Sequence, residues 1–325
     1  MASDQESPTK ETNSRYDQQE LISKLPKAET GIPAKDLYLY KGFWHPRSFL
    51  EGTISLQQDS KPINPTDIIL CSAPKAGFTW LKSLCYAIIT RDQLDESSSP
   101  LLTNVSHSLI PYMEIDLVKN PPNRNPEFPL LSTHSPFTSL PESVRNTPDC
   151  KIIYICRDPK DTLVSQWHYI KHMMIDGVSI EFWFDRFREG KIPWGPYWDH
   201  VLGYWKASIE MPEKVLFLKY EDLKKKTSFC VKRLAEFMGK PFSHQEEVEG
   251  LPEKMVKLCS FENLSNLEVN KVGKVEATGQ KEIGNGAFFR KGIIGDWKNC
   301  LTSEMIETLD RITREMFTGS DLVFD

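Results

Sequence analysis

Short apolar runs alternate with helical patterns through the middle of the chain. The runs that predict buried strands cover residues 67–72, 129–133, 151–156 and 215–220. Apolar residues recur at helical spacing from Thr79, and we expect further helices from Lys160 and over residues 228–238. Strands that alternate with helices predict an α/β fold: a single domain with a central parallel sheet flanked by helices.

The two ends of this pattern differ. Residues 1–20 are polar and rich in Ser, Thr, Glu, Asp and Gln, so we expect a disordered tail there. The domain is expected over 21–325, where apolar and aromatic residues begin. The tail has no apolar core of a secretory signal, and no apolar run approaches the roughly 20 residues that span a bilayer. We therefore expect a cytoplasmic protein that does not contact membranes.

Charge and cysteine content exclude several classes of protein. The net charge of −5 argues against a protein that coats nucleic acid, although a local cluster of cations can still bind an anionic ligand. The seven cysteines are scattered without a C-x-x-C pair. This spacing favours reduced, buried thiols over a disulfide framework, and it predicts no metal site.

The loop after the first predicted strand has the features of a phosphate cradle. Residues 74–80 read P-K-A-G-F-T-W and join a strand to a helix, whose first backbone N–H groups can bind an anion. Lys75 adds charge, and Thr79 can cap the helix and donate to a phosphate oxygen. The loop is not a Walker A sequence, which argues against a small-molecule kinase. A plain turn with a capping threonine is the alternative.

Two basic segments follow later predicted strands. Arg157 comes directly after one strand, and Ser165 lies two turns into the next helix, so both can bind one phosphate. The alternative for Arg157 is a surface ion pair with Asp158 or Asp161. Residues 290–292 place an arginine and a lysine before a glycine, which lets two cations and bare backbone approach an anion. A solvated loop would have the same composition.

His134 ends the short predicted strand at 129–133. Imidazole is the usual general base for a hydroxyl proton near neutral pH. Six other histidines are present, so spacing alone leaves a structural role open.

Together these segments resemble the soluble, or cytosolic, sulfotransferases. The donor loop of that family, P-K-S-G-T-T-W, corresponds to residues 74–80. The family segment R-[ND]-P-K-D-x-x-V-S is found at 157–165, and R-K-G-x-x-G-D-W is unaltered at 290–297. Residues 258–264 and 40–44 resemble the plant branch, which includes flavonol, brassinosteroid and hydroxyjasmonate sulfotransferases. The resemblance implies a P-loop-like sulfotransferase fold and runs from about residue 37 to the end of the chain.

The resemblance also implies a co-substrate and a reaction. The donor would be 3′-phosphoadenylyl sulfate (PAPS), released as adenosine 3′,5′-bisphosphate (PAP), with no metal. His134 would be the base for in-line attack by an acceptor hydroxyl, and Lys75 would stabilise the departing phosphate. The residues implied to bind the nucleotide are Lys75, Ala76, Gly77, Phe78, Thr79, Trp80, Arg157, Ser165, Tyr220, Cys259, Ser260, Phe261, Arg290, Lys291 and Gly292.

The expected acceptor is a small hydroxylated molecule such as a flavonoid, brassinosteroid or hydroxyjasmonate. Its expected contacts, chosen by position, are Phe43, Trp44, Tyr112, His168 and Tyr169. These residues would form an aromatic slot for a flat phenol or steroid, and each of them could instead belong to the core.

Three departures from the family pattern qualify these expectations. Ala76 and Phe78 replace the usual serine and threonine of the donor loop, which predicts weakened donor binding. A non-catalytic protein that binds PAP or an acceptor is therefore the alternative function. Ser303 replaces the valine of the dimer signature seen in mammalian members, so we expect a monomer or a weak homodimer.

Overall fold

Four parallel strands form the centre of the molecule, in the order β5-β4-β6-β7. Their bounds are β4 Ile68–Ser72, β5 Leu130–Thr133, β6 Lys151–Cys156 and β7 Val215–Lys219. Each bound lies within one residue of the predicted run, which confirms the parallel α/β sheet. The computed structural model describes residues 10–28, 36–58, 64–92, 97–118, 128–173, 177–276 and 282–324.

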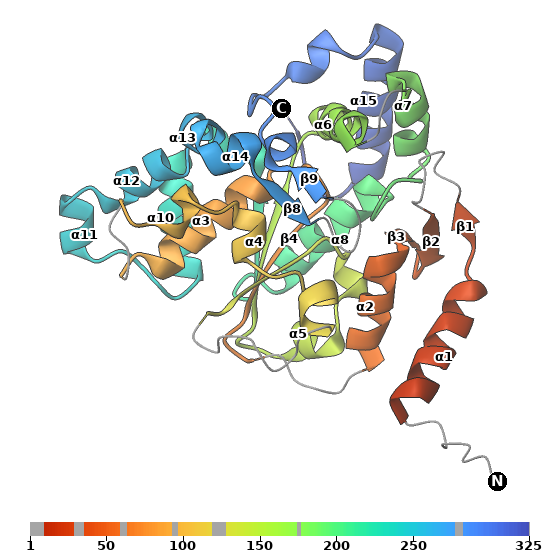
Figure 1. The fold of residues 1–325 in the computed structure, drawn as a ribbon. Helices are drawn as coiled ribbons and strands as arrows, with labels where there is room; N and C mark the ends of the chain where they lie inside the picture. Colours follow the sequence, from red (N-terminus) through yellow and green to blue (C-terminus); the bar gives the residue numbers. More distant parts are fainter. Residues whose placement is uncertain are drawn as a thin grey trace.

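Both faces of the sheet are buried, which is why its strands read as continuous apolar runs. Successive side chains of a strand point to opposite faces, so Ile69 and Cys71 join one core cluster and Ile68 and Leu70 join the other. Figure 1 shows α3, α10 and α12 together on one side of the molecule, away from α6, α7 and α15. Each group of helices contributes buried residues to one of the two clusters.

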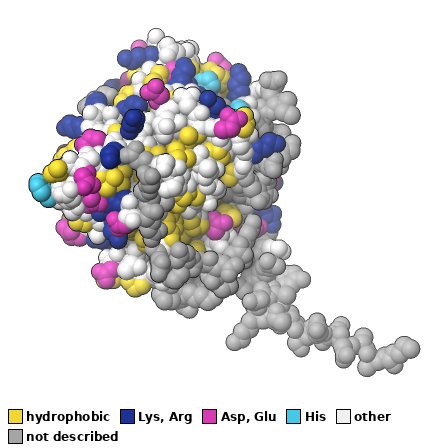
Figure 2. Space-filling view, turned by 60° about the vertical axis from the view of Figure 1, so that its left-hand side comes forward, with side chains coloured by type: hydrophobic (Ala, Val, Ile, Leu, Met, Phe, Trp, Pro, Cys, Tyr) yellow, Lys and Arg dark blue, Asp and Glu magenta, His cyan; other side chains and the backbone are white. Residues whose placement is uncertain are grey.

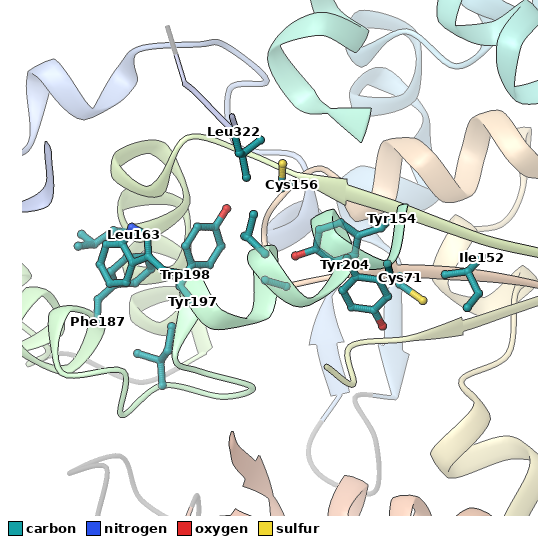
Figure 3. Packing of buried hydrophobic residues seen from close by; sticks show 14 of the residues in the cluster. Cys71, Ile152, Tyr154, Cys156, Leu163, Phe187, Tyr197, Trp198, Tyr204 and Leu322 are labelled. Atoms are coloured by element: carbon teal, nitrogen blue, oxygen red, sulfur yellow. The ribbon is translucent and has the colours of Figure 1, made fainter. Parts of the chain in front are cut away.

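The first cluster is rich in aromatic rings (Figure 3). Tyr154 on β6 stacks on Tyr204 of α8 with ring centroids 4.1 Å apart. The Tyr204 hydroxyl donates to the Ser135 carbonyl at 2.6 Å. This contact connects the core to the segment that directly follows β5.

The helices differ widely in length. The α-helices from α3 onward are α3 Phe78–Thr90, α4 Ser106–Leu109, α5 Glu142–Asn146, α6 Pro159–Met173, α7 Ile180–Arg188, α8 Tyr197–Glu210, α9 Tyr220–Lys225, α10 Thr227–Phe237, α11 His244–Val248, α12 Leu251–Leu258, α13 Phe261–Asn266, α14 Glu268–Val272 and α15 Ser303–Phe317. A π-helical turn, η2, covers Met113–Leu117, and short 3₁₀ turns are η1 Pro100–Leu102, η4 Phe137–Ser139, η5 Asn285–Phe288 and η6 Asp296–Asn299. The two-stranded sheet of β8 Lys274–Glu276 and β9 Glu282–Gly284 precedes η5.

The N-terminal part differs from the sequence-based expectation. Residues 1–9 of the predicted tail lie outside the described residues, but Lys10–Ser23 forms helix α1, so the boundary at residue 21 falls inside a helix. A three-stranded antiparallel sheet follows, with β1 Lys27–Ala28, β2 Leu37–Tyr40 and β3 Phe43–Pro46, and then α2 Arg47–Gln58. Gln18 of α1 donates to Ser55 of α2 at 3.2 Å, so the polar helix is held by tertiary contacts.

The surface is mixed in charge. On the face drawn in Figure 2, Lys and Arg are interspersed with Asp and Glu, and hydrophobic side chains gather near the middle. All seven cysteines are free, and six of them are buried. Within the described ranges, none of the helices has both the length and the apolar character needed to cross a bilayer.

Candidate functional site

The loop between β4 and α3 is shaped by two residues in the left-handed region. Lys75 has φ 69° and Gly77 has φ 104°. A Cβ at position 77 would lie 2.7 Å from Cδ2 of Tyr220, so the turn requires glycine. Helix α3 begins at Phe78 with Gly77 as its N-cap. The predicted capping by Thr79 is therefore wrong, because Thr79 already lies in the first turn of the helix.

The Lys75 side chain turns back toward the end of the chain. Its Nζ donates to the Ala287 carbonyl at 2.9 Å and lies 4.4 Å from the Tyr169 ring centroid. Burial, together with the nearby positive charges of Arg290 and Arg157, lowers the pKa of Lys75 to about 7. Three cations from distant segments therefore approach one another at this end of the sheet.

Arg157 is buried and follows β6 directly. Its Nη2 donates to the Ile293 carbonyl at 2.6 Å and pairs with Asp161 at 3.3 Å, and its guanidinium lies 4.6 Å from the Tyr220 ring centroid. The sequence allowed a surface ion pair between Arg157 and Asp161; this ion pair does form, but both side chains are buried. Nε of Arg157 is buried without a partner among the described residues, so one strong donor is left for a ligand.

The 290–297 segment is organised around two carboxylates. Asp161 of α6 accepts from the backbone N–H of Gly295 at 2.8 Å and of Trp297 at 3.3 Å. Asp296 accepts from Arg290 and from Lys291, the latter at 2.8 Å. Burial alone would raise the pKa of Asp296, but hydrogen bonds from Lys291 and Arg290 outweigh it and hold that pKa well below its usual range.

Two aromatic residues of the predicted nucleotide site, Trp80 and Phe261, contact other members of that site. The ring of Trp80 packs edge-on against the ring of Tyr220, with centroids 5.6 Å apart. The indole N–H of Trp80 is buried without a partner among the described residues. Phe261 lies against Gly292, where a Cβ would be 2.5 Å from its ring.

Four further members of the predicted nucleotide set are buried or bonded within the chain itself. The thiol of Cys259 is buried in the second core cluster, and the Ser260 hydroxyl caps α13 by accepting from Asn263 at 3.1 Å. Ser165 is buried on α6 and Ala76 is buried in the loop.

His134 lies beside the donor loop because β5 and β4 are neighbours. Its Nδ1 contacts the Ser72 carbonyl at 2.7 Å, and its Nε2 lies 3.2 Å from the Tyr112 hydroxyl. The ring of Phe78 is 4.8 Å away and that of Trp194 is 4.9 Å away. Burial lowers the pKa of His134 to about 3, although the bond to Ser72 opposes the shift. The imidazole is therefore neutral at physiological pH.

Glu114 holds the backbone on both sides of His134. Its Oε1 accepts from the hydroxyl of Thr133 and from that of Ser135, the latter at 2.7 Å. Burial raises the pKa of Glu114. Both of these hydrogen bonds are to the chain itself.

The predicted acceptor residues do not all lie together. Tyr112 touches His134, and Tyr169 faces Lys75. Phe43 packs edge-on against His200 at 6.2 Å, and the backbone of Trp44 pairs with Trp194. Tyr112 and Tyr169 therefore lie directly beside His134 and Lys75, whereas Trp44 reaches this region through its backbone bond to Trp194 and Phe43 through His200.

His168 has a different set of contacts, and its predicted role at the acceptor stays a prediction. Its ligand nitrogen lies within 4.8 Å of Cys300 and Asp296. Adjacent residues of a helix point about 100° apart, so His168 and Tyr169 face different sides of α6. The two oxygens of Asp296 already accept from cationic side chains, which makes this group a poor site for a metal ion.

Two functional candidates were missed by sequence reasoning. His107 of α4 forms a hydrogen bond at each ring nitrogen. Its Nε2 lies 2.9 Å from the Thr79 hydroxyl, and its Nδ1 lies 3.5 Å from the Tyr112 hydroxyl. Lys82 is completely buried on α3 and lies 4.0 Å from the Tyr112 ring centroid. Its position one turn after Phe78, on a helix face that is otherwise apolar, was the available signal for Lys82. His107 had none, because only the fold brings α4 to the loop.

The donor set fits an anionic nucleotide. Lys75, Arg157 and Arg290 supply cations, and Gly77 permits close approach of backbone. The buried Nε–H of Arg157 and indole N–H of Trp80 have no partners among the described residues. A neutral imidazole and a ring of aromatic side chains lie next to it.

Comparison with known proteins agrees with this geometry. A family model described as "Sulfotransferase domain" matches residues 65–321. A flavonol 4'-sulfotransferase from Flaveria chlorifolia is 49% identical over 94% of this chain and 96% of its own. The solved structure of an Arabidopsis thaliana putative steroid sulphotransferase has TM-score 0.73 and 36% identity, covering 99% of this chain and 100% of that chain. Mouse sulfotransferase SULT7A1, complexed with PAP, has TM-score 0.66 and 25% identity, covering 88% and 95%.

Proposed function

This chain belongs to the sulfotransferase domain family, and we propose from this that it transfers a sulfuryl group from PAPS to a phenolic hydroxyl with His134 as the base. It is a PAPS-dependent sulfotransferase that acts on a small molecule. The assignment of residues to roles and the class of acceptor are the parts that need a test. Both assignments rest on the position of His134 next to the cationic loop, at one end of the sheet.

The chain's own residues divide the work between the two substrates. His134 takes the proton of the acceptor hydroxyl at Nε2, because Nδ1 is committed to the Ser72 carbonyl. The bound donor supplies the sulfuryl group. Lys75 carries the positive charge that stabilises negative charge on the departing phosphate. Arg157 and Arg290 neutralise the second phosphate of the nucleotide, which distinguishes PAPS from ATP.

A flavonol-like acceptor is supported by the surroundings of His134. Phe78, Trp194 and Tyr112 place aromatic rings within 4.8 to 5.6 Å of the imidazole. Flat aromatic surfaces of this kind favour a planar phenol. The flavonol named for the Flaveria relative belongs to that chemical class.

One observation favours a second candidate, a non-catalytic protein that binds PAP. Phe78 replaces the threonine of the family loop, and its ring packs on the imidazole of His134. The ring then takes space next to the base and contributes no donor to a phosphate.

The test compares donor binding with transfer. We expect wild-type protein to bind PAP in calorimetry with preference over ATP, and to sulfate a flavonol. His134→Ala should lose transfer by about a hundredfold or more while it keeps PAP binding. His244→Ala, which removes an exposed histidine, is the matched control. PAP binding without transfer in the wild type would favour the non-catalytic function, and equal transfer by His134→Ala would remove His134 from the mechanism.

A further inference from the structure

A continuous chain of hydrogen bonds connects the donor loop to the base. Thr79 Oγ1 lies 2.9 Å from Nε2 of His107, and Nδ1 of His107 lies 3.5 Å from the Tyr112 hydroxyl. The same hydroxyl is 3.2 Å from Nε2 of His134, whose Nδ1 is 2.7 Å from the Ser72 carbonyl. The chain therefore begins at a carbonyl and ends at a residue of the donor loop.

The carbonyl sets the direction of every bond in this chain. A carbonyl can only accept, so Nδ1 of His134 carries the proton and Nε2 offers a lone pair. Tyr112 must then donate its hydroxyl proton to His134 and accept from Nδ1–H of His107. Nε2 of His107 is left without a proton, so Thr79 donates to it.

Both imidazoles have one proton under ordinary conditions. Burial lowers the pKa of His107 well below its usual value, and burial also lowers that of His134. Neighbouring rings pack on the two residues, with ring centroids 4.3 Å apart for Phe288 and His107 and 5.7 Å apart for Phe49 and Tyr112, while His107 itself stays partly exposed to solvent. The order of donors and acceptors is therefore fixed by the chain itself.

This arrangement has a cost for catalysis. In the free protein the Tyr112 hydroxyl occupies the nitrogen of His134 that must receive the acceptor's proton. An acceptor hydroxyl can reach that lone pair only after the Tyr112 hydroxyl turns its hydrogen bond to a different partner. The other atom within reach is Nδ1 of His107, which cannot accept while it carries a proton.

We propose that His107 and Tyr112 form a tautomer switch through which nucleotide binding at Thr79 makes the Nε2 lone pair of His134 available to the acceptor. The proposal rests on the proposed function and on the sequence-based expectation that Thr79 donates to a phosphate of the nucleotide. A phosphate oxygen only accepts, so Thr79 turns its proton to the phosphate and accepts from Nε2–H of His107 instead. Nδ1 of His107 is then free of its proton and accepts from Tyr112.

The protons balance in this change. His107 loses one proton from Nδ1 and gains one at Nε2 by exchange with water, so the ring remains neutral. The hydroxyl protons of Thr79 and Tyr112 stay on their oxygens and only change direction. Donor binding thereby precedes productive binding of the acceptor, without any movement of the backbone.

Nitrogen NMR of protein labelled with ¹⁵N-histidine tests the switch directly, because protonated and unprotonated ring nitrogens have widely separated shifts. The His107 signals are assigned by their loss in His107→Gln. In the free protein we expect the proton of His107 at Nδ1, and with saturating PAP we expect it at Nε2. His134 should keep its proton at Nδ1 throughout, while its Nε2 shift changes as Tyr112 turns away.

Two variants separate the links of the chain. In Tyr112→Phe, PAP should still move the His107 proton, but the Nε2 shift of His134 should no longer respond to PAP. The matched control Tyr86→Phe removes the hydroxyl of a different tyrosine, on α3, and should behave as wild type. PAP binding with the His107 proton unmoved would overturn the switch alone. Absence of PAP binding in calorimetry on the same sample would instead refute the donor site, and the switch with it.

Discussion

The binding of PAP should depend on pH through Lys75. Burial, assisted by Arg290 and Arg157, lowers the pKa of this lysine to about 7 in the free protein. An anion that contacts the ammonium group favours its charged form and therefore raises its pKa in the complex. Below pH 7 the lysine is already charged. Above pH 7 it must take up a proton when PAP binds, so affinity is lost as pH rises.

The size of the effect follows from the fraction of charged lysine. From a pKa of about 7, PAP affinity should fall about fivefold between pH 7 and pH 8, and about tenfold more by pH 9. Few other groups near Lys75 titrate in this window. The pKa of His134 lies far below it, that of Tyr169 is raised to about 12, and the second pKa of a phosphate is about 6.

Calorimetry in two buffers with different ionisation enthalpies measures the proton directly. At pH 8 the wild-type protein should take up nearly one proton for each PAP bound. Lys75→Met keeps the length of the side chain at this left-handed position, and it should bind PAP more weakly with no uptake. Equal affinity at pH 7 and pH 9, or uptake that persists in Lys75→Met, would refute the assignment of Lys75 to the donor site.

Two further substitutions test the donor loop and the support of the base. Phe78→Thr should tighten PAP binding by about tenfold, because it restores a hydroxyl donor to a charged group. It should also lower the free energy of unfolding by about 3 kcal/mol, because a buried ring is lost. Gly52→Ala should destabilise by at least about 3 kcal/mol, since its Cβ would lie 1.7 Å from the Glu114 carbonyl oxygen. Gly203→Ala, also helical but with only a 3.7 Å contact, should be neutral or stabilising by up to about 1 kcal/mol. Urea unfolding measures the stabilities, and calorimetry measures the PAP affinity. Unchanged PAP affinity in Phe78→Thr would contradict the reasoning on the donor loop. Equal stability of Gly52→Ala and Gly203→Ala would contradict the reasoning on Glu114.

The central sheet could be predicted from the sequence because burial on both faces leaves a continuous apolar run. The N-terminal elements could not. The four residues of β2 are all apolar or aromatic, as a core segment would be, and the strand pairs only with its short neighbours. Helix α1 has a polar sequence, and its contacts, such as Gln18 with Ser55, form only after α2 has folded.

The site was predictable where residues follow the ends of parallel strands. Lys75, His134 and Arg157 each come within a few residues of such an end, and neighbouring strands bring them together. Contacts made across the fold were not predictable, as for His107. Position along the chain alone could not place His168, since only the rotation of α6 decides whether it or Tyr169 faces Lys75.

The electrostatics of His134 lead to the same order of events as its hydrogen bonds. With a pKa of about 3 the imidazole is always unprotonated at neutral pH, as a base must be, but it holds a proton weakly. After burial, the positive charges of Lys82, His200 and Lys75 contribute to this low pKa. An anionic donor bound at Lys75 offsets its charge and raises the pKa of His134 toward the range in which a base is effective. We therefore expect a bound donor to strengthen His134 as a base, and an acceptor that arrives first to meet an imidazole whose Nε2 is occupied by Tyr112.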